Sequence, residues 1–289
     1  MIRLGIMGKD DRATSLIREA AVRGEVCPVF LNPGQWREED VDAVYISGAY
    51  RVSFREAMDL LAGGKHILMD GISRFSGSQL ADLFCTAAQR QVTFVENFYF
   101  TANPWLTVLN REMHRLGRVY QATFLSCGCG PGHDCPEASR DILGDVDFSQ
   151  GALMEKGVCC IYPVIKCFGM PEHFQSEPVF CENGMDIAGS IQGQCGGVRT
   201  EILYSSVSGS HIPSQIRGEQ GRFVIKGIGA SPEVRFYDSQ GQSEVLVSGD
   251  CRNETVYDQW RGCMEDSARY AAHRQDMLML HEVVDRIVS

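Results

Sequence analysis

Short apolar runs alternate with amphipathic helical patterns through the first hundred residues. The runs with the length and composition of strands are residues 2–7, 26–31, 43–47, 66–69 and 92–98. The segments with apolar residues at helical spacing are 12–23, 53–64 and 76–91. Strands that alternate with helices at this rhythm predict βαβ units, and therefore an α/β protein with an N-terminal, Rossmann-type doubly wound parallel sheet.

The pattern changes after residue 104. One amphipathic helix is expected over 105–116, and strand-like stretches then follow one another with little helix between them. These stretches are VYQATFLSC, EPVFCEN, MDIAGSIQG, VRTEILYSSV, GRFVIKGIG, EVRFYDS and SEVLVSG, and a helix near 266–288 closes the chain. The sequence predicts a shortened dinucleotide-binding domain over 1–100. Residues 101–289 are expected to form an α+β substrate and oligomerisation domain with a large, mostly antiparallel open sheet.

Composition and charge limit the classes of partner. Of the 289 residues 44% are hydrophobic and 22% are charged, and the formal net charge is -10. An acidic surface repels phosphate backbones and anionic membranes, so neither nucleic acid nor a membrane is an expected partner. No apolar run approaches the ~20 residues that span a bilayer, and charges come too early for a signal peptide. A cytoplasmic protein with a small-molecule substrate is expected.

The turn after the first strand departs from the dinucleotide-binding pattern. GKDDRA (8–13) lies where a Rossmann fold binds phosphates between the first strand and the first helix. Against G-x-G-x-x-G/A, Gly8 and Ala13 fit, whereas Asp10 replaces the middle glycine with a carboxylate that repels phosphate. The alternative, which we favour, is that this acid or the next one caps the helix. The second strand ends at Asn32, not at the acid that usually holds the ribose hydroxyls.

Five segments carry a family resemblance. They are VDAVYIS, EAMDLLAGGKHILMD, VTFVENFYFTANP, LGRVYQATF and GALMEKGVCCIYPVIKCFGMPE. Through them the sequence resembles, over nearly its whole length, the Gfo/Idh/MocA family of glucose–fructose oxidoreductase and inositol dehydrogenase relatives. The resemblance implies an NAD(P)-binding Rossmann domain and oxidation or reduction of a sugar, cyclitol or related alcohol. It also implies a homodimer or homotetramer built through a C-terminal sheet with an apolar outer face.

The positions that carry the family's chemistry are altered. Where the family has Glu-Lys-Pro, with a lysine that bonds the substrate hydroxyl and the nicotinamide ribose, this chain has DGI, with Gly71 in the lysine position. Where the family has Thr-Pro-Asn beside the nicotinamide, this chain has GAY (48–50). The family's arginine before Asn-Pro has become Thr101, whereas Glu96 and Pro104 remain.

The resemblance assigns candidate roles to the following positions. The cofactor-binding residues, for NAD or NADP unless binding is lost, are Gly8, Asp10, Asn32, Gly48, Asp70 and Glu96. In the family pattern D-x-G-x-x-x-x-H, Glu155 holds the position of the acid and Tyr162 that of the histidine, and these are the catalytic candidates. Seven residues apart on one helix, both should face the same way. Tyr162 could act as an acid with Arg74 or Lys156 lowering its pKa. The alternative, which we favour, is that Tyr162 is packed at the domain junction.

Cysteine is frequent in this chain. Most of the 12 cysteines, including Cys85, Cys159 and Cys160, are expected to be reduced and buried as small hydrophobic side chains. The stretch CGCGPGHDC (127–135) offers thiol and imidazole groups, but its spacing is not a strong zinc signature. A cleft loop with unpaired thiols, and no metal site, is expected there.

Two functions remain open from the sequence. The first is an NAD(P)-dependent oxidoreductase that acts on a sugar, cyclitol or related alcohol without the usual catalytic lysine and histidine. The alternative is a non-catalytic relative that binds a small molecule or a partner subunit through the retained fold. Binding of NADH and NADPH separates the two.

Overall fold

The computed structural model describes residues 1–32, 35–37, 40–48, 50–97, 104–128, 151–182, 184–228, 232–249 and 254–288. Contacts divide the chain into two units. Unit 1 comprises Met1–Ala102 and Arg252–Asp285, and unit 2 comprises Asn103–Cys251 and Arg286–Ser289. The sequence analysis placed all of 101–289 in the second domain, whereas these contacts group Arg252–Asp285 with the first.

Unit 1 contains a parallel five-stranded sheet in the order β2-β1-β3-β4-β5. Its strands are β1 (Ile2–Met7), β2 (Val26–Leu31), β3 (Ala43–Ile46), β4 (His66–Asp70) and β5 (Phe94–Asn97). The pairing of β1 with both β2 and β3 is parallel, as are the pairings of β3 with β4 and β4 with β5. The predicted Rossmann-type doubly wound sheet is therefore confirmed.

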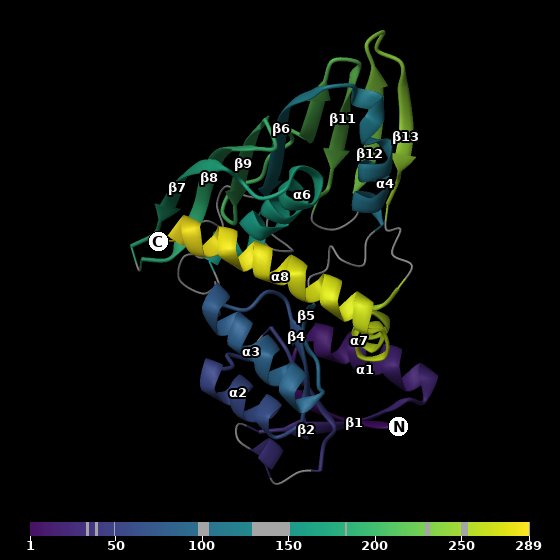
Figure 1. The fold of residues 1–289 in the computed structure, drawn as a ribbon, viewed down its shortest axis with the longest axis vertical. Coiled ribbons are helices and arrows are strands. Elements are labelled where there is room, and N and C mark those ends of the chain that lie inside the picture. The colour runs from purple at the N-terminus through teal and green to yellow at the C-terminus, as the bar shows by residue number, and fades with distance from the viewer. Residues whose placement is uncertain are drawn as a thin grey trace. The chain divides into compact units, whose positions relative to one another are not determined.

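Helices cover both faces of this sheet. They are α1 (Asp11–Arg23), α2 (Phe54–Ala62) and α3 (Gly77–Arg90), and the crossover from β2 to β3 shows only the 3-10 turn η1 (Gln35–Arg37) among the residues described. Ser53 caps α2, and Ser76 with Gln79 forms a capping box on α3, so local chemistry fixes where both helices begin. Figure 1 shows α2 and α3 together on one side of the sheet and α1 on the other.

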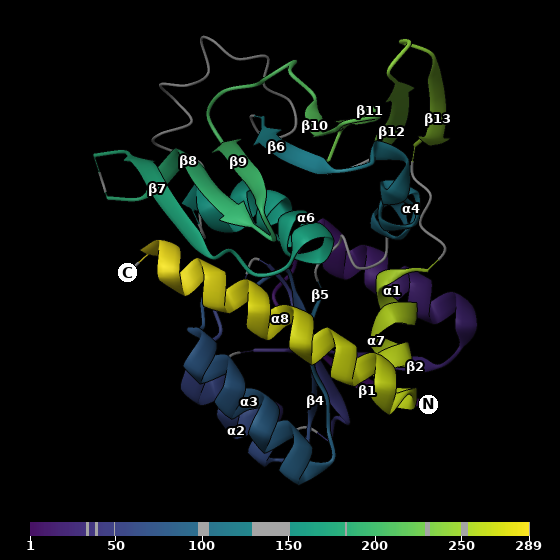
Figure 2. The same ribbon diagram turned by 45° about the horizontal axis from the view of Figure 1, so that its top comes forward.

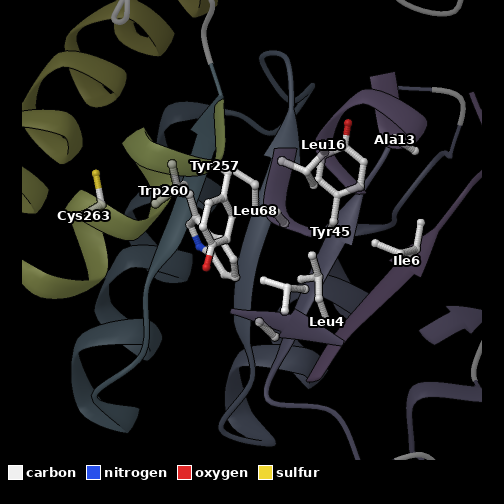
Figure 3. Packing of buried hydrophobic residues seen from close by; sticks show 13 residues of the cluster. Leu4, Ile6, Ala13, Leu16, Tyr45, Leu68, Tyr257, Trp260 and Cys263 are labelled. Atoms are coloured by element: carbon white, nitrogen blue, oxygen red, sulfur yellow. The ribbon is translucent and has the colours of Figure 1, made fainter. Parts of the chain in front are cut away.

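Two C-terminal helices complete unit 1. The sequence analysis expected one helix near 266–288, and the structure has α8 (Ser267–Val288) preceded by a separate α7 (Val256–Glu265). Thr255 and Asp258 form a capping box at the start of α7. Tyr257 and Trp260 of α7 join the core formed by strand residues such as Leu4 and Leu68 (Figure 3). Burial of these aromatic side chains makes α7 part of the hydrophobic core of unit 1.

Unit 2 is built on a large sheet of eight strands in the order β13-β12-β11-β10-β6-β9-β8-β7. The strands are β6 (Val119–Cys127), β7 (His173–Phe180), β8 (Asp186–Cys195), β9 (Val198–Ser205), β10 (Ser214–Gly218), β11 (Gly221–Lys226), β12 (Glu233–Asp238) and β13 (Ser243–Val247). All neighbours are antiparallel except β6 and β9. The predicted large, mostly antiparallel sheet is confirmed.

The helices of unit 2 lie against one face of this sheet. The segment expected over 105–116 is α4 (Trp105–Glu112) followed by the 3-10 turn η3 (Met113–Leu116). A π-helical turn, η4 (Leu153–Gly157), runs directly into α6 (Val158–Phe168). Figure 2 shows α6 alongside β6, β8 and β9, which it also contacts.

The outer face of the large sheet is more polar than the sequence analysis expected. On β9, Tyr204 is buried on the same face as Ile202. The other face of β9 carries Arg199 and Glu201, which form an ion pair at 2.8 Å, and the exposed Leu203. The outer face of this strand is therefore only partly apolar, because two of these three outward side chains are paired charges.

Candidate functional site in unit 1

In the sheet of unit 1, β2 is added on one side of β1, whereas β3, β4 and β5 are added on the other side. Because β1 pairs with β2 on one edge and with β3 on the other, the two halves of the sheet carry their helices on opposite faces. In open α/β sheets, ligands bind at this point, just outside the carboxyl ends of the strands. The residues found there are called the switch-point cluster: Gly8, Arg12, Ser47, Gly48 and Asp70.

Gly8 follows β1 in a conformation that favours glycine. Its φ is +90°, and a Cβ added there would lie 2.3 Å from Oγ of Ser47. Ser47 directly follows β3 and donates its backbone N–H to the Met7 carbonyl at 2.9 Å. The Ser47 side chain is buried, and its hydroxyl has no hydrogen-bond partner among the described residues. Gly8 thus allows β1 and β3 to approach closely around a buried hydroxyl that is able to bond a ligand.

Asp10 is the N-cap residue of α1. Its Oδ1 accepts a hydrogen bond from the backbone N–H of Ala13 at 2.7 Å, and its carbonyl accepts one from Thr14 N–H at 3.1 Å. The favoured alternative of the sequence analysis, helix capping, is therefore confirmed. A role for Asp10 in cofactor binding stays a prediction.

An ion pair crosses the carboxyl ends of the strands. Nη1 of Arg12, in the first turn of α1, lies 3.3 Å from Oδ2 of Asp70, the last residue of β4. The Asp70 side chain is 6% exposed and that of Arg12 is 73% exposed, so a fixed, buried carboxylate holds a guanidinium that faces solvent. A Cβ on Gly48 would be in ordinary contact with Asp70, at 3.6 Å. The charge of Asp70 raises the pKa of Arg12, which stays a cation.

The surroundings of Asp70 are polar but largely enclosed. Asn97, at the end of β5, donates from Nδ2 to Oδ1 of Asp70 at 3.5 Å. Tyr45 of β3 is fully buried, and burial together with the charges of Asp70 and Asp10 raises its pKa. Tyr45 therefore stays neutral at any physiological pH and is not a source of protons here.

The end of β2 carries no acid at the usual ribose position. Asn32 is exposed, and both its backbone N–H and its Nδ2 donate to Oε1 of Gln35, at 3.0 Å and 3.1 Å. Close to it, Nζ of Lys9 lies 5.4 Å from the centre of the Phe30 ring. This edge of the sheet therefore presents an amide, an ammonium and an exposed aromatic face.

Glu96 is a buried partner of a histidine. One carboxylate oxygen accepts from the backbone N–H of Ser73 at 2.9 Å, and the other lies 2.9 Å from Nε2 of His281. Burial raises the pKa of Glu96, but the charge and hydrogen bond of His281 and the bonds from Ser73 lower it by more. Both oxygens are thus engaged inside unit 1, and cofactor binding by Glu96 stays a prediction.

Gly71 occupies the position of the family's lysine. Its φ is +88°, a Cβ there would meet nothing within 4 Å, and its N–H donates to the Asn97 carbonyl at 3.1 Å. The position is therefore open in space but strained for any residue other than glycine.

The two catalytic candidates lie in unit 2 on one continuous helical segment. Glu155 belongs to the π-turn η4 and Tyr162 to α6, so the helix between them is not a regular α-helix. The Glu155 side chain is half exposed, lies 3.3 Å from Nζ of Lys156 and accepts from Ser206 Oγ at 3.2 Å. Tyr162 is buried, with Nζ of Lys166 6.0 Å from its ring centre. Their shared role stays a prediction, and π-turns often mark functional sites.

The cysteines in the described part of the chain are free thiols, as predicted. Among the described cysteines Cys85 is exposed, Cys160, Cys195 and Cys263 are buried, and the others, Cys159 included, are partly buried, so burial is less general than predicted. Burial raises the pKa of Cys159 to about 12, which keeps that thiol protonated.

Several positions named in the sequence analysis lie outside the described residues. They are Ala49, Thr101 and the part of the cysteine-rich loop that holds Cys129, His133, Asp134 and Cys135. Within the described ranges, no cluster of three or more His, Cys, Asp or Glu side chains is arranged to hold a metal ion. The helices described here are all too short or too polar to cross a membrane.

Sequence comparison finds related oxidoreductases but no matching family model. The chain is 25% identical over 218 residues to the scyllo-inositol 2-dehydrogenase (NADP(+)) IolU of Bacillus subtilis, covering 75% of this chain and 66% of that protein. It is 22% identical over 219 residues to the uncharacterized oxidoreductase YgjR of Escherichia coli, with 75% and 67% covered. The resemblance to the Gfo/Idh/MocA family is confirmed. The matches span about two thirds of the length of these family members.

Solved structures of similar fold cover the whole chain. KijD10, a 3-ketoreductase from Actinomadura kijaniata crystallised with TDP-benzene and NADP, matches with a TM-score of 0.76 at 18% identity, covering 100% of this chain and 97% of that one. The aldose-aldose oxidoreductase of Caulobacter crescentus, complexed with glycerol, matches with a TM-score of 0.72 at 11% identity, covering 99% and 96%. At these identities the likeness establishes the fold and nothing finer.

The sequence analysis did not single out the partners of its candidates. Ser47 directly follows an apolar strand and Asn97 ends one. This position after an apolar run is the signal that could have placed both at the carboxyl edge of the sheet. His281 could not be found in this way, because it lies on a C-terminal helix 185 residues away from its partner Glu96.

Proposed function

We propose that the chain is an NAD(P)-dependent oxidoreductase that acts on a sugar, cyclitol or related alcohol without the usual catalytic lysine and histidine. The observation that carries the proposal is the switch-point cluster at the carboxyl edge of a Rossmann-type sheet. The named activity of IolU and the NADP complexes of KijD10 support the same class of cofactor.

The residues at the switch point fit a nicotinamide dinucleotide. The buried Ser47 hydroxyl lacks a partner among the described residues and can donate to a phosphate oxygen, and Arg12 offers a cation at the start of α1. Gly8, Gly48 and Asn32 would line the path of the nucleotide, with Asn32 at the adenosine ribose. The bound nicotinamide would supply hydride transfer to or from a carbon of the substrate.

We further propose that NADP(H) is preferred to NAD(H). The end of β2 has Asn32 where an acid would repel a 2′-phosphate, and the ammonium of Lys9 lies beside Phe30 at the same edge. A 2′-phosphate would gain an attractive partner there, whereas the ribose hydroxyls of NAD would lack their usual carboxylate.

Proton transfer is assigned to unit 2 in this proposal. Glycine at position 71 has no group that can exchange a proton, and Tyr45 is held neutral. Glu155 is half exposed and is hydrogen-bonded by Ser206, which keeps its carboxylate oriented and accessible to a substrate hydroxyl. Tyr162 is the second candidate, as an acid whose hydroxyl would pass its proton to the reacting oxygen.

A non-catalytic relative is the second candidate function. The observation that favours it is Gly71, because the lysine position is open yet holds no reactive group. A protein of this kind would bind a small molecule or a partner subunit without turnover.

A lysine introduced at position 71 tests whether the chain lacks only this catalytic amine or carries its proton-transfer group elsewhere. Gly71→Lys is expected to give no more dehydrogenase activity on polyols and sugars than wild type, because a φ of +88° disfavours any side chain at this position and Asp10 still repels the cofactor's phosphates. Gly71→Ala is the matched control, since it has the same backbone strain and no amine. Steady-state assays with NADP+ and NAD+ provide the measurement. Activity gained by Gly71→Lys but not by Gly71→Ala would show that only the amine was missing.

We also propose a cytoplasmic homodimer or homotetramer formed through the large sheet of unit 2. The exposed Leu203 of β9 and the exposed Val179 of β7, the two strands that flank β8, supply apolar contact for a second copy. Light scattering should give two or four times the 32.1 kDa of the chain. A monomer at micromolar concentration would exclude this assembly.

A further inference from the structure

We propose that Arg12 is the ligand for the diphosphate of the nucleotide and that Asp70 positions it for this role. The inference rests on the proposed function and names the residue that makes up for the lost glycine of the phosphate-binding turn. Three observations carry it: the capped start of α1, the geometry of the ion pair between Arg12 and Asp70, and the buried Ser47 hydroxyl beside Gly8.

The start of α1 is poorly suited to bind phosphate through its backbone alone. Asp10 caps the helix and already accepts the N–H of Ala13, one of the donors that a phosphate would otherwise use. The same carboxylate brings a negative charge to the turn. A diphosphate can bind there only if a nearby cation offsets this charge.

Arg12 is placed to supply that cation. It lies in the first turn of α1, two residues after Asp10, and its side chain reaches over the end of β3 to Asp70 at the end of β4. The guanidinium has five N–H donors, and only Nη1 is engaged with Asp70, at 3.3 Å. Because its side chain is 73% exposed, the remaining donors are accessible from solvent. Guanidinium groups bind phosphate through paired N–H donors of this kind.

Asp70 acts on the nucleotide through Arg12. The carboxylate is 6% exposed, so it is fixed by its surroundings, including the amide of Asn97, and its hold on one nitrogen restrains a long, flexible side chain. A restrained cation loses less conformational entropy when a ligand binds. Asp70 is therefore a positioning residue for Arg12.

Ser47 provides the independent sign of a ligand at this place. Its side chain is 1% exposed, and its hydroxyl has no partner within the described structure although it lies beside Gly8 of the phosphate turn. Buried hydroxyls are almost always hydrogen-bonded. A phosphate oxygen held by Arg12 would satisfy this one.

The test compares two arginines of the same helix by calorimetric titration. The probes are NADPH and ADP-ribose, which share the diphosphate, whereas ADP-ribose lacks both the nicotinamide and the 2′-phosphate. Arg12→Gln is expected to weaken binding of both about 10–100-fold, as for the loss of a charged hydrogen bond. Arg18→Gln removes the same charge from an exposed position further along α1 and is expected to change affinity by less than about twofold. Arg12→Lys should bind both probes with an affinity between those of Arg12→Gln and Arg18→Gln.

A double-mutant cycle tests the role of Asp70. Asp70→Asn is expected to weaken ADP-ribose binding where Arg12 is present and not to weaken it in the Arg12→Gln background. A purely structural role would give the same loss in both backgrounds. Thermal unfolding of each variant shows whether the fold is intact.

The outcomes separate this inference from the proposed function. If Arg12→Gln binds both probes as tightly as Arg18→Gln, Arg12 is not the ligand and the inference is overturned while nucleotide binding stands. If Arg12→Gln binds more tightly, the ion pair obstructs the site, and the inference is likewise overturned. If the wild type binds neither probe, the proposed function itself fails and the inference fails with it.

Discussion

Replacing Glu96 with alanine is expected to lower the free energy of unfolding by about 3–5 kcal/mol, the usual cost of breaking a buried ion pair. Glu96 and His281 are both inaccessible to solvent and lie 2.9 Å apart. Nδ1 of His281 also faces an acceptor, the Phe75 carbonyl at 2.8 Å, so both ring nitrogens donate only when the ring is protonated. Alanine would leave a buried cation and the Ser73 N–H without their partner. Urea unfolding measures the effect.

Glu96→Gln is the matched control for this prediction. The amide can accept from Ser73 and donate to a neutral His281, so every hydrogen bond survives and only the charges are lost. We expect a cost of about 1 kcal/mol. A glutamine variant as unstable as the alanine variant, or an alanine variant within about 1 kcal/mol of wild type, would contradict the interpretation of a charged pair.

The Glu96–His281 pair should also make the free energy of unfolding depend on pH. The quantity to follow is the wild-type advantage, which is the free energy of unfolding of the wild type minus that of Glu96→Gln. Burial lowers the pKa of His281, but Glu96, the Phe75 carbonyl and Asp285 raise it above 6.5, so its contribution is complete below 6.5 and is lost as the pH rises through the raised value. The pKa of Glu96 is lowered below 4.5, so its contribution is complete above 4.5 and is lost as the pH falls. The advantage should therefore be largest between 4.5 and 6.5.

Asp10→Gly is expected to strengthen nucleotide binding by about 1–3 kcal/mol, or roughly 5- to 150-fold in Kd. The substitution removes a charge that repels the diphosphate and lets the backbone approach it. Loss of the cap on Ala13 N–H should cost only a few tenths of a kcal/mol of stability, because glycine is itself an acceptable N-cap. Calorimetric titration with NADPH measures the affinity, and thermal unfolding measures the stability.

Asp10→Asn distinguishes the two causes of this effect. Asparagine caps helices as well as aspartate does, so it removes the charge and keeps the cap and the bulk. If repulsion dominates, both variants gain alike; if close approach matters as well, glycine gains more. A loss of affinity in Asp10→Gly would mean that the carboxylate itself takes part in binding.

The fold was predictable because two different periodicities divide the chain. The βαβ rhythm of the first hundred residues and the run of strands after residue 116 each have one common packing solution. The separate helix α7 was missed, although Thr255 and Asp258 form a local capping signal before it. The π-turn η4 was also missed, because one extra residue in a helix does not alter the apolar pattern enough to be seen.

The candidate site was only partly predictable. The loss of the lysine at position 71 could be seen because an apolar strand fixes where the turn begins. The contact of Arg12 with Asp70 could not, since it joins residues 58 positions apart through side chains that cross β3. Glu96 matches the family pattern in the sequence, but its place in a buried ion pair could not be predicted, because its partner His281 is far along the chain.

Titration of the purified wild-type chain with NADPH and NADH tests the central claim most directly, because the proposed function requires a nucleotide at the switch-point cluster. Calorimetry should give a Kd for NADPH in the micromolar range, which corresponds to a binding free energy of about -8 kcal/mol. NADH should bind more weakly. Binding of both nucleotides at about 1 mM or weaker, near -4 kcal/mol, would contradict the account and favour the non-catalytic relative.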